Sequence, residues 1–172
     1  MSKNVNLQMS DIVIYLRLDT YLAQWLTHEH GGHPVVFPKN SVEHNILETF
    51  LTTRPPFGAQ VGPGENRVAI QLPYLKNKNV RYSNFLPQSA RRSLANCIRN
   101  RFIIALWNDL YRFGNIGRRK QDLIWAWIEA HGIDATETNW NTIAKIYKRK
   151  RDAYQRQQKQ LEKERGEENN PP

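Results

Sequence analysis

The chain has 172 residues, which is enough for one domain, or for one domain and a small second one. Hydrophobic residues make up 40% of it and include five Trp, seven Tyr and six Phe, so the composition excludes a largely disordered chain and favours a packed core. The net charge of +9 favours an anionic partner, with nucleic acid first and an anionic membrane surface second.

The same sequence indicates where the protein works. No apolar run approaches the ~20 residues that a membrane-spanning helix needs, and the first residues lack the apolar centre of a signal peptide. The single cysteine, Cys97, excludes an internal disulfide and is typical of a reducing compartment. Its apolar, helical surroundings predict a buried thiol rather than a nucleophile. We therefore expect a cytoplasmic protein without membrane contact.

The first eighty residues predict a small α+β unit. Residues 11–18 are apolar and β-branched, which predicts a strand. A helix capped by Asp19 or Thr20 should follow and end at the glycine pair of residues 31–32. Residues 34–38, "PVVFP", can form only a short strand because a proline stands at each end.

A second helix and a second strand complete this unit. Asn40 stands three residues before Glu43, which is the capping-box spacing, and an apolar stripe follows. That stripe consists of Val42, Ile46, Phe50 and Leu51. Residues 52–66 carry three Pro and three Gly and predict a loop, and residues 67–72, "RVAIQL", alternate as a half-buried strand does.

The second half of the chain predicts three helices, over residues 89–112, 118–131 and 137–158. Apolar residues recur every three or four positions in each, and glycines follow the first two. Trp107, Trp127 and Trp140 fall on or near the apolar faces, so we expect them to be mostly buried together. Residues 161–172 are polar and end in two prolines, which predicts a disordered tail.

The positive charge is concentrated in the second half. Residues 1–80 hold seven Lys and Arg against six Asp and Glu, and residues 81–160 hold sixteen against six. Residues 161–172 hold two against four. The excess over residues 81–160 favours a polyanion that contacts the helical part.

The last two predicted helices resemble a helix-turn-helix unit, in which the second helix enters the major groove of DNA. Such a helix needs short polar side chains near its N-terminus for base edges and cations further along for phosphates. The base-reading candidates are Thr138, Asn139, Asn141 and Thr142. The phosphate-contacting candidates are Arg118, Arg119, Lys120, Lys145, Lys148, Arg149 and Arg156. At 100° per residue the last four of these share one side of the helix, interrupted by Asp152.

Other interpretations of the same residues remain open. A basic helix at the end of a three-helix bundle is often simply solvated, and aromatic residues between cations are also typical of single-strand binding. His28, His30 and His33 form a candidate metal cluster, but their spacing across a Gly-Gly turn matches no usual zinc pattern. The chain has no phosphate-binding loop, nucleophile elbow or HExxH motif, so the sequence predicts neither catalysis nor a cofactor, and a small-molecule ligand is not expected.

A short segment resembles a known family. The residues "GGHPVVFPK", Gly31 to Lys39, are similar to the segment before the helix-turn-helix of the Mor family of phage middle-operon transcription activators. The resemblance covers nine of the 172 residues and carries over no functional residue. It implies an origin in a phage or another mobile element.

The sequence thus predicts an α+β protein with a small N-terminal unit over residues 1–80 and a mainly helical, helix-turn-helix-like unit over residues 81–160. The first interpretation of its function is non-enzymatic, sequence-specific binding of double-stranded DNA by a regulator, with the N-terminal unit as a candidate for homodimerisation. The second is a structural or scaffold protein of a phage or mobile element with a basic interaction helix. The third is a nucleic-acid-processing enzyme.

Overall fold

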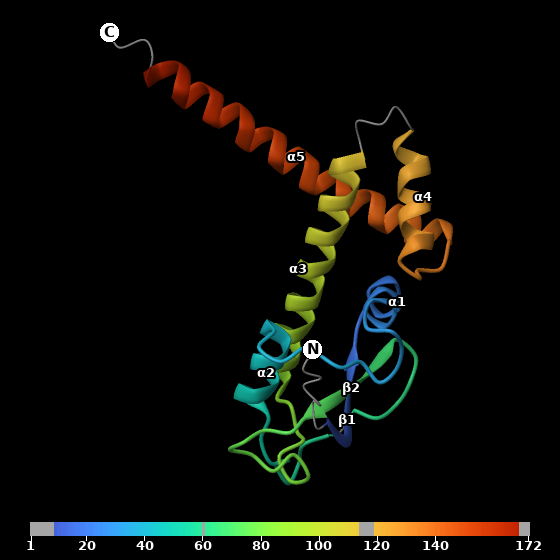
Figure 1. Cartoon of the computed structure of the whole chain (residues 1–172), viewed down its shortest axis with the longest axis vertical. Helices are drawn as coiled ribbons and strands as arrows, with labels where there is room; N and C mark the ends of the chain where they lie inside the picture. Colours follow the sequence, from blue (N-terminus) through green and yellow to red (C-terminus); the bar gives the residue numbers. More distant parts are fainter. Residues whose placement is uncertain (1–8, 60, 114–118, 169–172) are drawn as a thin grey trace, which may run out of the picture. The chain divides into compact units, whose positions relative to one another are not determined.

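A computed structural model of the chain describes residues 9–59, 61–113 and 119–168 (Figure 1). The chain divides into two compact units, unit 1 over Met1–Arg101 and unit 2 over Phe102–Pro172. The boundary falls inside a helix, later in the chain than the boundary near residue 80 that the sequence predicts. None of the described helices is both long enough and apolar enough to cross a membrane.

The connector after β2 explains the later boundary, because it is bonded to unit 1. The Lys78 Nζ donates hydrogen bonds to the carbonyl oxygens of Glu48 and Thr49, at 2.6 and 2.9 Å. Thr52 and Phe85 form an antiparallel bridge with backbone hydrogen bonds of 3.0 Å in both directions. These contacts satisfy polar backbone groups near the end of α2, and they attach residues 74–87 to the first unit.

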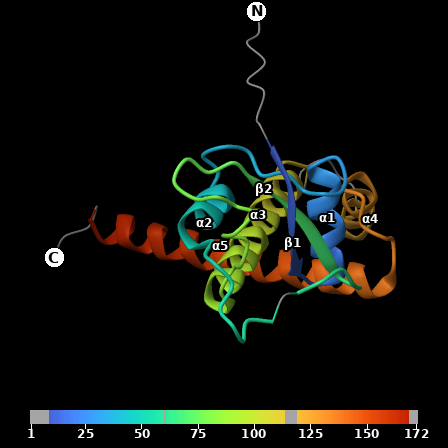
Figure 2. The same cartoon turned by 90° about the horizontal axis from the view of Figure 1, so that it is seen from below.

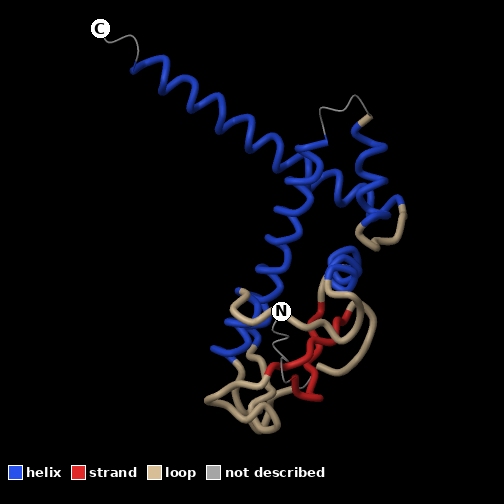
Figure 3. The backbone as a smooth tube through the Cα atoms, viewed as in Figure 1, coloured by secondary structure: helices blue, strands red, loops and turns tan. Residues whose placement is uncertain are grey.

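Unit 1 has the α+β composition that the sequence predicts. Its elements are β1 (Met9–Arg17), α1 (Thr20–Glu29), α2 (Val42–Phe50), β2 (Arg67–Pro73) and the first part of α3 (Gln88–Phe113). The described strands all belong to this unit (Figure 3). They lie between α1 and α2 in both cartoon views (Figure 2).

The two strands pair antiparallel, with Ile14 opposite Ile70 and Leu16 opposite Val68. The predicted alternation in β2 is confirmed, because Val68, Ile70 and Leu72 are buried and the residues between them are half-buried. The predicted strand over residues 34–38 is reduced to one parallel bridge, between Val35 and Ile70. The flanking prolines lack the N–H that a longer ladder requires.

Helix α2 begins one residue later than its sequence predicts. Ser41 is the N-cap, and its Oγ accepts a hydrogen bond from the His44 N–H at 3.1 Å, while Asn40 has a φ of 67°. The helix is also rotated relative to the predicted apolar stripe, since Val42 is 61% exposed whereas Glu43 is 2% exposed. An ion pair of Glu43 with a later arginine, described below, makes this burial of a carboxylate tolerable.

Unit 2 contains the rest of α3 together with α4 (Lys120–Ala130) and α5 (Glu137–Glu168). Its core consists mainly of apolar side chains from these three helices and the turn before α5. The buried residues are Phe102, Leu106, Leu110, Ile124, Trp127, Ile128, Ile133, Ile143 and Tyr147.

Helix α5 passes through the region that the sequence assigns to a disordered tail. Residues 161–168 are helical, so the predicted end at residue 158 is wrong, and only residues 169–172 of that tail lie outside the described residues. Gln, Lys, Glu and Arg all have high helix propensity. The Gln160 Nε2 donates to the Glu164 Oε1 at 3.1 Å, one turn later. The C-terminal turns of α5 extend away from α4 in both views of the chain (Figures 1 and 2).

The three tryptophans predicted to form one cluster lie in three different ring contacts. Trp127 makes an edge contact with Phe102, and their ring centroids are 5.4 Å apart. Trp107 packs against tyrosines of α3 and α5, and Trp140 stacks on Trp125. Trp127 is buried, and Trp107 and Trp140 are half-buried. The single cluster is not formed, because the three helices present different faces to one another, which periodicity alone does not define.

Candidate nucleic-acid interface

A tight turn joins α4 to α5. Gly132 has a φ of 66° and its N–H donates to the Glu129 carbonyl oxygen at 3.2 Å, while the Ile133 N–H donates to the Ile128 carbonyl oxygen at 3.1 Å. These two hydrogen bonds form a Schellman motif, in which the residue after the glycine packs against the helix that it ends. Ile133 is buried, so the turn holds α4 and α5 in one arrangement.

Thr136 stands directly before α5 and caps it. Its Oγ1 accepts a hydrogen bond from the Asn139 N–H at 3.2 Å. The Asn139 side chain turns back toward the loop, and its Nδ2 donates to the Asp134 carbonyl oxygen at 3.0 Å. Asn139 is only 8% exposed. We therefore remove it from the base-reading candidates, because its amide is buried and already bonded within the turn.

The other three base-reading candidates lie on the outer side of the first turns of α5. Thr138 and Asn141 are exposed, and Thr142 is half-buried. The Thr142 Oγ1 donates to the Thr138 carbonyl oxygen at 2.9 Å, so its hydroxyl can only accept a further hydrogen bond. Thr138 and Asn141 are therefore the side chains best able to reach a base edge.

The predicted phosphate contacts of α5 are all exposed and share one face with these two polar residues. Lys145, Lys148, Arg149 and Arg156 lie on the side opposite to the buried Ile143 and Tyr147. None of the four forms an ion pair with another described residue. We call the exposed residues Thr138, Asn141, Lys145, Lys148, Arg149, Arg156 and Lys159 the outer face of α5.

Two further features of this face were not predicted from sequence. Lys159 extends the row by one turn, and it was missed because the helix was expected to end at residue 158. Asp152, which interrupts the row, accepts hydrogen bonds from the guanidinium of its neighbour Arg151 at 3.2 and 3.4 Å. That ion pair compensates part of the negative charge on the face.

Helix α4 adds cations at its N-terminal end. Arg119 is the N-cap residue and Lys120 the first residue of the helix, and both are exposed. The N-terminus of a helix carries partial positive charge, so cations there cost stability unless an anion is nearby. The remaining candidate, Arg118, lies outside the described residues.

An aromatic cluster supports the inner side of α5. The ring centroid of Trp107 lies 5.1 Å from that of Tyr111, 5.8 Å from that of Tyr147 and 5.3 Å from that of Tyr154. On α4, the Trp127 Nε1 donates to the Asp109 Oδ2 at 3.0 Å, and the Trp127 ring stacks on His131. These contacts hold α3, α4 and α5 together on the side away from the outer face.

The histidine cluster lies at the end of α1. The His33 Nε2 is 3.2 Å from the Thr27 Oγ1, and His30 makes an edge contact with Phe37. Among the described residues, no three His, Cys, Asp or Glu side chains are grouped so that they could hold a metal ion. Burial and the nearby Arg101 lower the pKa of His30. His28 is exposed.

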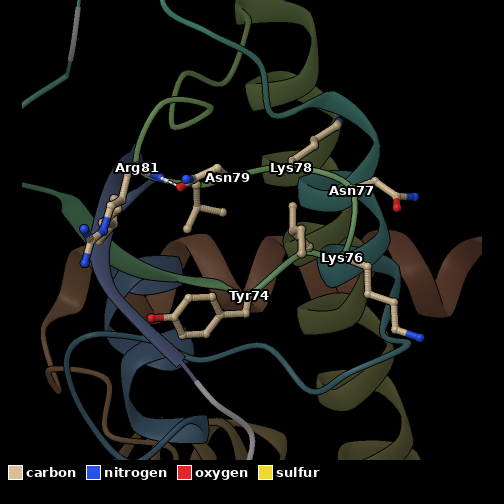
Figure 4. Close-up of a pocket in the computed structure, with 9 residues that line it drawn as sticks. Tyr74, Lys76, Asn77, Lys78, Asn79 and Arg81 are labelled. Carbon is tan, nitrogen blue, oxygen red and sulfur yellow. Dashed lines mark hydrogen bonds between the residues drawn. The ribbon is translucent and has the colours of Figure 1, made fainter.

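A cavity of about 620 Å³ lies inside the loop of residues 74–81 (Figure 4). The two lysines of this loop, Lys76 and Lys78, do not converge on the cavity. Lys78 reaches toward α2, where it is hydrogen bonded, and Lys76 extends away from the loop. The Asn79 Oδ1 accepts a hydrogen bond from the Arg81 N–H at 3.0 Å, which stabilises the turn.

The unit boundary divides the positive charge of the second half of the chain. Unit 1 holds twelve Lys and Arg against six Asp and Glu, and unit 2 holds thirteen against ten. The excess that the sequence analysis assigned to one helical region is therefore divided between two units. In unit 2 the distinctive feature is therefore the arrangement of positive charge along α5, not the net charge of the unit.

Comparison of the chain with protein families, with curated proteins and with solved structures gives no match.

Proposed function

We propose that the protein binds double-stranded DNA without catalysing a reaction, and that the outer face of α5 is the contact surface. One observation carries the proposal: exposed cations without ion-pair partners among the described residues follow Thr138 and Asn141 along one side of the helix. Cations spaced along a helix suit the phosphates beside a groove, and short polar groups at its N-terminal end suit base edges.

The α4–α5 arrangement supports the same proposal. The Schellman turn and the buried Ile133 hold the two helices together, as a helix-turn-helix unit requires. Arg119 and Lys120 would place further cations against the phosphate backbone. Gly31–Lys39 resembles a segment of the Mor activators. We therefore propose, more specifically, that the protein is a transcription regulator of a phage or mobile element.

A salt titration of DNA binding tests the contact surface. If each outer-face cation neutralises one phosphate, the logarithm of the binding constant falls linearly with the logarithm of salt concentration. Replacing Lys148 and Arg149 by Gln should then reduce the magnitude of this slope by about two. The matched control is Lys39→Gln with Lys76→Gln, which removes the same charge from exposed residues of unit 1. Equal slopes for both double variants would contradict the proposal.

Sequence reading requires a separate measurement. Replacing Asn141 by Ala should cost roughly 1–3 kcal/mol on a selected duplex and leave the affinity for random DNA and the salt slope nearly unchanged. Gln157→Ala is the matched control, because Gln157 is exposed on the same helix but lies off the outer face. Loss of discrimination in the Asn141 variant alone would support a regulator.

The length of α5 favours a second candidate, a scaffold or assembly protein. A helix of 32 residues is about 48 Å long, and its last turns are exposed and add Lys163 and Arg165 beyond the outer face. A protein of this kind would grip backbone or an acidic protein surface without reading bases. If Asn141→Ala and Thr138→Ala change binding on no sequence while the charge variant weakens it on all, the scaffold becomes the better account.

Dimerisation stays a proposal for unit 1. On α2, Val42 is 61% exposed and Phe50 is 47% exposed, so the helix presents apolar surface that a second copy could cover. Sedimentation equilibrium of the parent and of Val42→Ser with Phe50→Ser tests it. A monomeric parent would end this part of the proposal.

A further inference from the structure

Four arginines meet at one cavity of unit 1. The cavity has a volume of about 310 Å³ and lies where β1 ends, β2 begins and α3 starts. Arg17, Arg67, Arg91 and Arg92 line it together with Gln88, and the other described lining residues are apolar. No Asp or Glu is among them. A concave site with four guanidinium groups and no described carboxylate calls for an anion from outside the chain.

The strands bring two of these arginines face to face. Arg17 and Arg67 are direct partners in the antiparallel register of β1 and β2. Like charges directly opposite each other destabilise a sheet. The Arg67 Nη1 donates to the Gly62 carbonyl oxygen at 2.9 Å, which anchors one side chain but leaves its charge uncompensated. This pair lowers stability unless a negative group lies between the two guanidinium groups.

Helix α3 brings the other two to the same place. Two residues of α3 at the cavity, Gln88 and Arg91, are three residues apart, and so are the other two, Arg92 and Ala95. Arg92 is also four residues after Gln88, and Ala95 is four after Arg91. These spacings place the four on one face of the helix. Arg92 is exposed, and Arg91 is half-buried. A single helix face thus supplies two guanidinium groups and one side-chain amide to the cavity.

Arg91 is held in position before any ligand binds. Its Nε donates to the Leu86 carbonyl oxygen and its Nη1 to the Tyr15 carbonyl oxygen, both at 2.8 Å. Burial lowers the pKa of Arg91, because the charge is partly removed from water. The guanidinium still has further N–H groups, and its planar fork suits an oxyanion. A fixed cation costs less conformational entropy on binding than a free one.

The next arginines on α3 show that this cavity differs from its surroundings. The Arg99 Nη2 is 3.1 Å from the Asp19 Oδ2, and the Arg101 Nη1 is 2.7 Å from the Glu43 Oε1. Unit 1 therefore supplies carboxylates to two arginines of the same helix. The cavity arginines form no ion pair with a described residue, so their positive charges remain available to an anionic ligand.

We infer that this cavity binds a phosphate-bearing ligand, with the four guanidinium groups donating to phosphate oxygens and the Gln88 amide adding a further polar contact. A compact polyanion suits the cavity better than a singly charged anion does, because four cations line the cavity. The inference is independent of the proposed DNA contact of α5, since every residue that carries it belongs to unit 1.

Binding of inorganic pyrophosphate to the full chain tests the inference. Calorimetry should detect saturable binding, and the ligand should raise the melting temperature above that in sodium chloride of equal ionic strength. Arg17→Gln with Arg92→Gln should weaken binding at least about tenfold, since charge-assisted hydrogen bonds are lost. These two residues are exposed, so the double variant should fold.

A control and a second readout keep the result interpretable. Lys39→Gln with Lys76→Gln removes the same charge from unit 1 outside the cavity and should bind pyrophosphate like the parent. Arg17→Gln alone should melt no lower than the parent without ligand, because it relieves the repulsion with Arg67. The inference is overturned if the parent shows no saturable binding, or if both double variants bind with equal affinity.

Competition identifies the source of the phosphate. Displacement of pyrophosphate by short duplex DNA would assign the cavity to a nucleic-acid backbone. Displacement by inorganic phosphate or tripolyphosphate, but not by DNA, would assign it to a free phosphorylated ligand. The α5 variant Lys148→Gln with Arg149→Gln should retain its pyrophosphate affinity, so the cavity and the DNA proposal can fail separately.

Discussion

Glu43 is a carboxylate inside unit 1, at 2% exposure, and its Oε1 lies 2.7 Å from the Arg101 Nη1. Arg101 itself is about 40% exposed along its side chain. Removing a charge from water is costly, and this ion pair recovers part of that cost. Burial raises the pKa of the Cys97 thiol, and the nearby Glu43 carboxylate raises it further. The thiol is therefore disfavoured as a nucleophile.

Arg101→Met should therefore destabilise the protein by about 3 kcal/mol, because it leaves the Glu43 carboxylate buried without its partner. Glu43→Gln with Arg101→Met should recover much of this loss. Urea denaturation of the parent, both single variants and the double variant gives the coupling free energy. A loss in the double variant as large as the sum of the single losses would show that the pair is not coupled.

Asn139 and Asn141 should behave differently, although they stand two residues apart on α5. Asn139→Ala removes the hydrogen bond to the Asp134 carbonyl oxygen and should lower the free energy of unfolding by about 1 kcal/mol. Asn141→Ala should leave stability within about 0.5 kcal/mol, because Asn141 is exposed. Thermal denaturation of the two variants makes the comparison. Equal effects on stability would contradict the assignment of Asn139 to the turn.

The stability of unit 1 should depend on pH through His30. Burial, then Arg101, lowers its pKa in the folded chain below the ordinary value of 6.5. Below about pH 6.5 the unfolded chain thus binds more protons, so the free energy of unfolding should fall as the pH drops toward the folded-state pKa. His30→Gln should flatten this decline. Urea denaturation between about pH 7.5 and pH 5 measures the slope, and an equally steep decline in the variant would exclude His30 as its source.

At the scale of elements, the α4–α5 turn depends on one backbone conformation. Gly132 has a φ of 66°, which a residue with a side chain adopts only at a cost. Gly132→Ala should lower stability by about 1–2 kcal/mol and weaken DNA binding if α4 must be aligned with α5. Gly62→Ala is the control, because a Cβ there meets nothing within 4 Å and no positive φ is present. The control should be neutral or slightly stabilising.

Much at this scale could be predicted from the sequence. The alternation of Val68, Ile70 and Leu72 in β2 and the cap of α5 at Thr136 follow local rules, because each depends on neighbours in the chain. The stripe on α2 could not be predicted in the same way. The burial of Glu43 there depends on Arg101, far away in sequence.

For the whole molecule, the two cationic sites should act independently. The cavity variant Arg17→Gln with Arg92→Gln and the α5 variant Lys148→Gln with Arg149→Gln change residues of different units. Their effects on the free energy of unfolding should add within about 0.5 kcal/mol when the two double variants are combined. Chemical denaturation of the four proteins measures this. A larger deviation would reveal energetic coupling between the sites.

The sequence by itself determined the α+β class, the alternation of β2 and the amphipathic character of α5. Each of these depends on spacing along the chain, and spacing reports a local period. The tertiary structure alone decided that Asn139 belongs to the turn. It also assigned five arginines after residue 80 to unit 1, and brought Arg17, Arg67 and Arg91 to one cavity. The physical reason is that burial, hydrogen-bond partners and the convergence of charges depend on contacts between residues distant in sequence, which no local pattern encodes.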